Sequence, residues 1–268
     1  MKSIKTILSE QLQYAYLIRR LSMYELKKTY VANMLGIVWV FLNPIIQIGV
    51  YWIIFGLGIR GGAPVNGVPY FVWMISGLVP WFYISSSIIQ GSNSIYARLS
   101  GVSKMNFPLS IIPSYVILSR LYTHLILMML LIVIVIVNQG ISSVHFLILI
   151  YGMLSLTIFL IALSFITSTL STIVRDVHLL IQSVTRMLFF ITPILWEPKE
   201  NMPQLFLSLM KLNPFYYVIE LYREALVYDS TSILFSVYTL YFWGIIIFMF
   251  TVGSLLHVRF RRQFIDYL

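Results

Sequence analysis

Residues 146–172 read FLILIYGMLSLTIFLIALSFITSTLST, and none of these side chains carries a charge. An α-helix rises 1.5 Å per residue, so about 20 apolar residues cross the roughly 30 Å hydrocarbon core of a bilayer. This stretch is therefore long enough to span a membrane. The whole chain has the same character, because 59% of its 268 residues are hydrophobic, only 10% are charged and the mean hydropathy is +0.89. Soluble domains carry roughly 25% charged residues, so the composition excludes a soluble enzyme and indicates a polytopic membrane protein.

Runs with few or no charges repeat along the chain on both sides of this stretch. We predict an all-α polytopic membrane protein with six transmembrane helices, at about residues 34–58, 69–95, 115–137, 146–172, 178–196 and 233–257. The run at 178–196 is the weakest of the six because Arg186 interrupts it. An even number of spans places both termini on the same side of the membrane.

The 18 basic residues divide unevenly between the two sides that these spans define. Thirteen fall on the side of the termini, namely Lys2, Lys5, Arg19, Arg20, Lys27, Lys28, Arg98, Lys104, Arg120, Arg175, Arg259, Arg261 and Arg262. Four lie in the outer loops, at Arg60, Lys199, Lys211 and Arg223, and Arg186 lies deep within a span. Cytoplasmic segments are enriched in Lys and Arg, so we expect both termini in the cytoplasm. The net charge of +9 then reflects topology, and no nucleic-acid partner is expected.

The N-terminal segment, residues 1–33, precedes the first span and has an amphipathic helical pattern. Its apolar face holds Ile4, Ile7, Leu8, Ala15, Ile18 and Leu21, and Lys2, Gln13, Arg20 and Lys27 lie opposite. We predict an interface helix on the inner membrane surface, whose basic residues are Arg19, Arg20, Lys27 and Lys28. Two roles remain open, an electrostatic anchor to anionic lipid and a lever between the membrane and a cytosolic partner.

Residues 197–231 form the one sizeable outer segment. Two apolar stretches in it are too short to span, and Asn213-Pro214 separates them. We predict two short re-entrant helices before the last span, with Pro214 near the start of the second. Glu220 shares a helix face with Glu224 and lies close to Arg223. These charges form either a solvated, partly paired face or a substrate contact.

Catalytic and metal motifs are almost entirely missing from the sequence. It has no HExxH, GxSxG, GxGxxG or phosphate-loop pattern, and the SxxK match at residues 208–211 lacks its companion motifs. The histidines are scattered, and zero cysteines leave no disulfide framework and no thiolate metal site. No cytoplasmic cluster of carboxylates is present to hold Mg²⁺. We therefore predict no catalytic residue and no metal site in this chain.

Arg186 is the most informative single residue. It lies eleven positions beyond Arg175, about 16 Å along a helix, which is too deep to reach the membrane surface easily. A cation inside a membrane span is a functional candidate by default. Arg186 either meets a phosphate-bearing substrate or pairs with carbonyls and hydroxyls of a neighbouring helix.

Several motifs together resemble one family. They are Leu35-Gly-Ile-Val-Trp-Val-Phe-Leu-Asn-Pro44, Gly77-Leu-Val-Pro-Trp81, Asn106-Phe-Pro108, Arg175-Asp176, Thr192-Pro-Ile-Leu195, and Leu212-Asn-Pro-Phe215 followed by Arg223. In this order and spacing the sequence resembles the ABC-2 type permeases of polysaccharide exporters over nearly its whole length. Within that family it most resembles permeases that export teichoic acid, and O-antigen permeases are the close second.

The resemblance implies a homodimer bound to two copies of a separate ABC ATPase, with residues 34–268 as the transmembrane domain. ATP and Mg²⁺ bind to that partner and no cofactor to this chain. The lengths of the predicted cytoplasmic segments are consistent with a separate ATPase. The longest has about 33 residues, which is too short for a nucleotide-binding domain. The family's coupling loop falls on Arg98, Ser103, Lys104 and Met105. One departure is the run Ser103-Lys-Met-Asn106, where the family pattern has a further basic residue before the Phe-Pro pair.

The expected function is ATP-driven export of undecaprenyl-diphosphate-linked teichoic acid across the bacterial cytoplasmic membrane. The alternative cargo is O-antigen or another lipid-linked polysaccharide. Two other classes stay open, a lipid-phosphate transferase and a passive channel. The expected substrate passage consists of Arg186, Trp81, Tyr83, Phe190 and Trp196, and the expected outer exit consists of Tyr216, Tyr217, Glu220 and Arg223.

Overall fold

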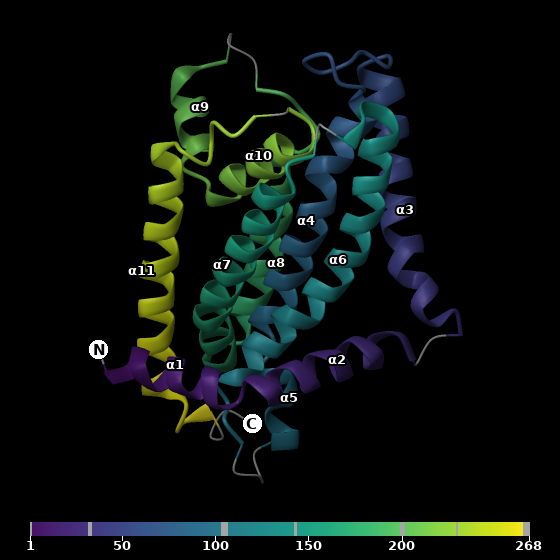
Figure 1. Ribbon diagram of the computed structural model, residues 1–268. Coiled ribbons are helices and arrows are strands. Elements are labelled where there is room, and N and C mark those ends of the chain that lie inside the picture. The colour runs from purple at the N-terminus through teal and green to yellow at the C-terminus, as the bar shows by residue number, and fades with distance from the viewer. Residues whose placement is uncertain are drawn as a thin grey trace.

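The structure is a computed structural model that describes residues 2–31, 34–102, 107–141, 144–198, 202–228 and 230–264. In these ranges it is built from helices without a β-strand (Figure 1). The helices are α1 (Lys2–Gln13), α2 (Ala15–Val31), α3 (Trp39–Tyr51), α4 (Tyr70–Ser92), α5 (Tyr96–Val102), α6 (Ile111–Gln139), α7 (Phe146–Ile173), α8 (Asp176–Ile191), α9 (Gln204–Lys211), α10 (Pro214–Leu226) and α11 (Val237–Phe260). A 3₁₀ turn (Gly36–Val38) precedes α3, and a π-helical segment (Trp52–Ile59) continues it.

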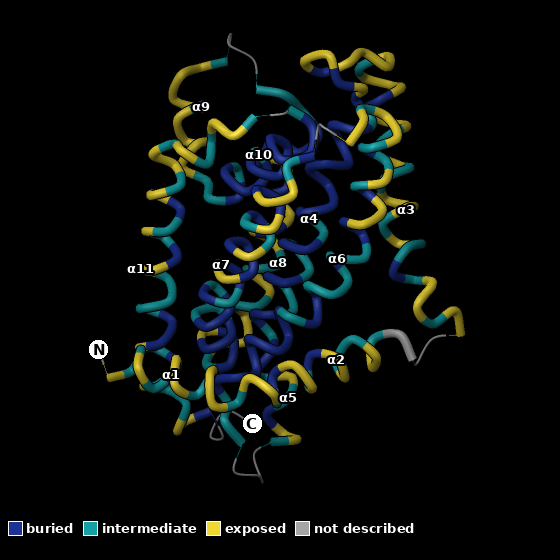
Figure 2. The backbone as a smooth tube through the Cα atoms, viewed as in Figure 1, coloured by how far each residue is buried: buried dark blue, intermediate teal, exposed yellow. Residues whose placement is uncertain are grey.

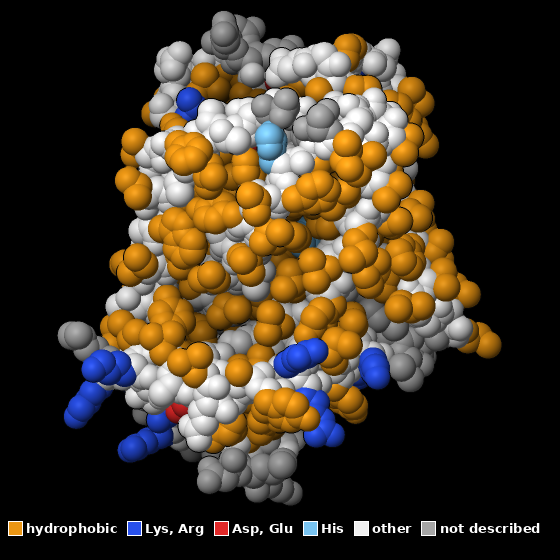
Figure 3. Space-filling model, viewed as in Figure 1, with side chains coloured by type: hydrophobic (Ala, Val, Ile, Leu, Met, Phe, Trp, Pro, Cys, Tyr) orange, Lys and Arg blue, Asp and Glu red, His pale blue; other side chains and the backbone are white. Residues whose placement is uncertain are grey.

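Five of these helices are long and apolar enough to cross a membrane: α3 with its flanking turns, α4, α6, α7 and α11. The all-α polytopic fold is therefore confirmed. α4 lies at the centre, where 78% of its most apolar window is buried, and α3 lies at the edge with 6% buried (Figure 2). Apolar side chains cover the middle of the bundle on the face shown, and Lys and Arg gather mainly at the end where α1 and α2 lie (Figure 3).

The predicted span at 178–196 forms a shorter helix than expected. α8 has 16 residues, about 24 Å, which is less than the roughly 30 Å hydrocarbon core. It nevertheless runs along the bundle. His178 Nδ1, near the start of α8, lies 2.8 Å from Ser92 Oγ at the C-terminal end of α4. Asn213, just before α10, donates to Thr192 Oγ1 just after α8 at 2.9 Å. The fifth predicted span, at residues 178–196, is thus not matched by a full-length helix.

The N-terminal segment was predicted as one helix, and the structure divides it into α1 and α2 at Tyr14. Both helices lie across one end of the bundle, which the sequence predicts to be the cytoplasmic end (Figure 1). Ile18 packs in a buried cluster with Leu99 of α5 and Phe264 near the C-terminus. The apolar face of α2 therefore rests partly on protein and not only on lipid.

The two predicted short helices before the last span are present as α9 and α10. The Asn213 side chain accepts a hydrogen bond of 3.0 Å from the Phe215 N–H, and Pro214 begins α10, as expected for a capped helix start. α10 is largely buried and packs against α4 and α7. Its backbone is protected inside the protein, which is what a helix dipping back into the bundle requires.

α7 and α11 approach closely because Gly253 has no side chain. A Cβ placed at Gly253 would lie 2.8 Å from Phe165 Cβ, closer than real Cβ contacts. Small residues at helix contacts are the usual means of close packing in membranes. By contrast, a Cβ at Gly244, on the same helix, would meet nothing within 4 Å.

Candidate functional site

The side chain of Arg186 lies in a cavity of about 330 Å³ between α3, α4 and α8. The residues that line it are Gln47, Tyr51, Trp81, Phe82, Ser85, Ile89, Thr185, Arg186, Phe189 and Phe190. The structure therefore brings together three of the predicted passage residues, Arg186, Trp81 and Phe190. Arg186 is exposed in the single chain, and its Nη2 donates to Ser183 Oγ one turn earlier at 3.1 Å.

The chemistry of this cavity suits an anion next to an apolar or sugar-like group. A guanidinium carries five N–H donors in a planar fork that matches phosphate oxygens. The lining residues, all in the described part of the chain, include no carboxylate to compete for it. The ring of Phe189 lies 5.7 Å from Trp81 and 5.4 Å from Tyr51, centroid to centroid, so the opposite wall is aromatic.

Tyr83 and Trp196 lie apart from Arg186. Tyr83 is 2% exposed, and its hydroxyl donates to Thr157 Oγ1 at 3.1 Å, while its ring stacks on His124 at 4.8 Å. Trp196 donates from Nε1 to the Phe190 carbonyl at 2.9 Å and lines an outer cavity of about 590 Å³. In this conformation Tyr83 holds helices together, and Trp196 belongs to the outer surface.

The predicted outer exit contains a buried arginine. Arg223 is 1% exposed; its guanidinium lies 3.7 Å from the centre of the Trp73 ring. Nη1 donates to Glu220 Oε1 at 2.8 Å, and Nη2 donates to the Ile194 carbonyl at 3.0 Å. Arg223 therefore ties α10 to α4 and to the turn that follows α8, and this packing role was not predicted from the sequence.

The other predicted exit residues differ in exposure. Tyr217 is 2% exposed and shares a hydrogen bond of 2.9 Å with Thr239 of α11, so it is also a packing residue. Tyr216 and Glu220 are half-buried. Burial, together with the nearby Glu220 carboxylate, raises the pKa of Tyr216 to about 12, so its hydroxyl remains a hydrogen-bond donor at physiological pH. Only Tyr216 and Glu220 are placed to meet a polymer without a rearrangement.

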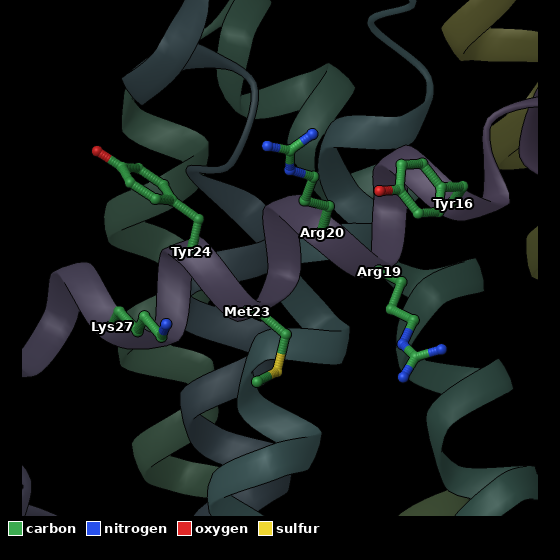
Figure 4. A pocket seen from close by; sticks show the side chains of 6 residues that line it. All are labelled: Tyr16, Arg19, Arg20, Met23, Tyr24 and Lys27. Carbon is green, nitrogen blue, oxygen red and sulfur yellow. The ribbon is translucent and has the colours of Figure 1, made fainter.

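The predicted basic residues of the N-terminal helix lie on the exposed surface of α2. Arg19, Arg20 and Lys27 line a shallow hollow of about 580 Å³ together with Tyr16, Met23 and Tyr24. Figure 4 shows Arg20 and Tyr24 pointing to one side of α2 and Arg19 and Met23 to the other. Lys28 is exposed next to them. This surface offers cations and aromatic rings to a partner or to lipid headgroups.

One of the four predicted coupling residues is described. Arg98, on α5, forms an ion pair with Glu25 of α2, and its guanidinium lies 5.6 Å from the Tyr115 ring centre. Ser103, Lys104 and Met105 lie outside the described residues. α5 therefore connects α2 directly to the segment that leads into the predicted coupling loop.

Two acidic residues at the end of the bundle where α1 and α2 lie were not singled out in the sequence. Glu25 pairs with Arg98, and Glu10 of α1 pairs with Arg261 after α11 at 2.8 Å. The sequence did offer a signal, namely a carboxylate inside a basic amphipathic segment. Because a carboxylate weakens binding to anionic lipid, its presence indicates an ion pair within the protein. The partners themselves are distant in sequence and could not be identified from it.

Comparison with known proteins agrees with this architecture. Residues 16–227 match the family model described as ABC-2 type transporter, which is more than half of the chain. The chain belongs to the ABC-2 type transporter family. It is 28% identical to the O-antigen export system permease protein RfbA of Myxococcus xanthus over 224 residues, covering 83% of this chain and 84% of that protein. An RfbA permease of Klebsiella pneumoniae is also 28% identical, over 253 residues that cover 91% and 92% of the two chains.

Family membership fixes the class of function. The chain is a multi-pass permease subunit of the cytoplasmic membrane that works with an ABC ATPase, and it is not an enzyme. The lipid-phosphate transferase and passive-channel readings of the sequence are thereby set aside.

Proposed function

We propose that this chain is the membrane permease of an ATP-driven exporter of lipid-linked polysaccharide. Its similarity to permeases named for O-antigen export supports this proposal. The cavity around Arg186 supports it as well, since a cation beside aromatic walls suits a diphosphate joined to sugars. The lipid tail stays in the hydrocarbon, and the polar polymer passes along the protein.

The observation that carries the proposal is the connected layer at the inner end. Ion pairs join α1 to the end of α11 through Glu10 and Arg261, and α2 to α5 through Glu25 and Arg98. Ser22 Oγ lies 3.1 Å from the Tyr122 hydroxyl and ties α2 to α6. A push on the exposed face of α2 is therefore passed directly to α5 and α6, as conformational coupling to an ATPase requires.

The surroundings of Arg186 support a homodimer. A charged side chain at membrane depth is costly against lipid and faces either protein or water. The single chain leaves Arg186 exposed on α8, beside exposed apolar residues of α8 and of the sparsely packed α3. A second copy covering this side encloses the two Arg186 cavities in one passage. Two copies of the ATPase then bind beneath, one for each α2 surface.

Two kinds of polymer are candidates for the cargo. The curated relatives favour an O-antigen type of polysaccharide, whereas the motif resemblance favours undecaprenyl-diphosphate-linked teichoic acid. Both carry a diphosphate on an isoprenoid lipid and differ in the polymer. The Arg186 cavity accommodates the part that they share.

Reconstitution tests the proposal. The chain and its ATPase are placed in vesicles with isoprenoid-diphosphate-linked O-antigen or teichoic acid, and exposure of polymer at the far leaflet is measured with and without ATP. We expect ATP-dependent exposure that needs both subunits, and a faster rate with the O-antigen polymer. Exposure by this chain alone, or equal exposure without ATP, contradicts the proposal.

A variant tests the coupling layer in the same vesicles. Glu25→Gln removes the partner of Arg98, so we expect ATP hydrolysis to continue while export per ATP falls. Glu197→Gln is the matched control, because it breaks the ion pair with Arg60 at the outer end, away from the ATPase. An equal loss of coupling in both variants contradicts transmission through α2 and α5.

A further inference from the structure

A two-part cavity lies between α3, α4 and α6, and α8 takes no part in it. One part, about 280 Å³, is lined only by apolar residues and glycine: Phe41, Pro44, Ile45, Ile48, Gly49, Phe71, Ile75, Val79, Leu127, Leu130, Leu131 and Ile134. The other part, about 150 Å³, is more polar and includes Asn43, Ser86, Arg120, Thr123 and His124. Pro44 and Leu127 line both parts, so the two adjoin.

The polar part lies at the depth of lipid headgroups. Arg120 Nη2 donates to Thr29 Oγ1 of α2 at 3.1 Å, and two residues further along α6 Tyr122 contacts Ser22 of α2. These contacts hold α2 beside this level of the bundle. α2 lies across the bundle with its cations exposed, which is the position of a helix in the membrane interface.

The apolar part continues into the hydrocarbon region. Leu130 follows Arg120 by ten residues, about 15 Å along α6 and half of a roughly 30 Å core. The cavity thus offers polar groups at the headgroup level and an apolar lining over the depth of one leaflet. A soluble anion would use only the polar part, whereas a lipid uses both.

Charge selects the kind of lipid. Arg120 is 7% exposed and presents a guanidinium, and no carboxylate is among the described residues that line the polar part. Basic pockets between spans on the inner side of a membrane bind anionic headgroups. The geometry points to a binding site for one anionic glycerophospholipid from the leaflet next to α2, with its phosphate at Arg120 and one acyl chain along Leu127 and Leu130.

Such a lipid joins α3 to the rest of the bundle. Only 6% of the apolar window of α3 is buried within the chain, and the cavity lining comes from α3 on one side and from α4 and α6 on the other. The bound acyl chain packs against α3 on one side and against α4 and α6 on the other. This site is independent of the proposed cargo, because it lies outside the Arg186 cavity and requires no ATPase.

Two variants test the site by different means. Gly49→Phe fills the apolar part, and the fold can accept it because a Cβ at Gly49 meets nothing within 4 Å. Gly244→Phe is its control, since Gly244 is equally open on α11. Arg120→Gln removes the headgroup cation, with Arg259→Gln as the control for loss of one exposed charge.

The full-length chain is placed in phosphatidylcholine vesicles with phosphatidylglycerol spin-labelled on its acyl chain, and the motionally restricted lipid is measured by electron paramagnetic resonance. We expect wild type and both controls to prefer phosphatidylglycerol over phosphatidylcholine. Arg120→Gln should lower that preference about fivefold, the contribution of one cation near an anionic headgroup. Gly49→Phe should remove the restricted component at this site for both lipids.

Unchanged preference and unchanged restricted lipid in both variants overturn the site. So does a restricted component that appears only with labelled undecaprenyl phosphate, because the cavity would then belong to the path of the cargo. If Arg120→Gln fails to fold, Gly49→Phe decides the question alone, with loss of the restricted component supporting the site and its retention overturning it.

Discussion

Replacing Arg223 with alanine is expected to destabilise the protein more than replacing any exposed arginine. The change removes a guanidinium that is 1% exposed and stacked on Trp73 at 3.7 Å. It also leaves the Ile194 carbonyl and the Glu220 carboxylate without this partner. The three contacts link Arg223 to α4, to the turn after α8 and to Glu220 of α10 itself. A single substitution removes all three.

The size of the effect follows from these contacts. A hydrogen bond from a charged donor contributes about 1.5–3 kcal/mol, and a desolvated cation–π contact contributes about 2 kcal/mol. The Glu220 side chain is 19% exposed, so its ion pair is screened and adds about 1 kcal/mol or less. The expected loss in the free energy of unfolding is therefore about 3.5–6 kcal/mol, which overlaps the roughly 3–5 kcal/mol typical of removing one member of a buried pair.

Unfolding of the purified chain by sodium dodecyl sulfate in bicelles, followed by circular dichroism, measures this loss. Arg60→Ala is the matched control, because Arg60 also pairs with a carboxylate, Glu197 at 3.1 Å, and lies over a tyrosine ring. Its side chain is 21% exposed, so we expect a loss below about 1 kcal/mol. Arg223→Lys should fall between the two, since an ammonium lacks the planar fork. Equal losses for Arg223→Ala and Arg60→Ala would refute the packing role.

Three further predictions use the same protein. Arg186→Ala should weaken the apparent affinity for lipid-linked polymer about tenfold or more in substrate-stimulated ATPase assays, as loss of a charge-assisted contact implies; unchanged stimulation and export would remove its role. Gly253→Ala should lower the free energy of unfolding in detergent by about 1–3 kcal/mol, because the new Cβ meets Phe165. The control Gly244→Ala should change it by less than about 1 kcal/mol. Equal effects of the two substitutions would contradict the close approach of α7 and α11. Asn213→Ala should cost about 1 kcal/mol by loss of the α10 cap, and no measurable loss would show that the cap is dispensable.

The sequence predicted the elements of the fold well, because hydropathy and helix punctuation are local properties. The span predicted at residues 146–172 corresponds to α7, Phe146–Ile173, and α10 begins at Pro214 as the Asn213-Pro214 pair predicted. The prediction was weakest where tertiary packing replaces lipid. Tyr14 divides the N-terminal segment into two helices, and the apolar face of α2 packs partly on the bundle. Periodicity alone cannot distinguish such a protein surface from a membrane surface.

The candidate site was predicted only in part for a related reason. Trp81, Phe190 and Arg186 do line one cavity, but Tyr83 and Trp196 do not reach it. An aromatic residue in a span is equally suited to a passage and to a helix contact, and its direction depends on how neighbouring helices rotate. Ion pairs such as that between Arg98 and Glu25 join residues far apart in the sequence, so they could be identified only from the structure.

Arg186 and Arg223 show why a charge in an apolar sequence does not by itself identify a substrate site. The donors of Arg223 are directed at a carboxylate and a carbonyl of its own chain, under an aromatic ring, so an incoming anion would have to displace partners already in place. Arg186 makes its described hydrogen bond to Ser183 of the same helix, and its remaining donors open into a cavity. Capacity for a ligand depends on the donors that the fold leaves unused. By this criterion Arg186 has donors left for an anion such as the diphosphate of the proposed cargo, whereas Arg223 serves the packing of α10.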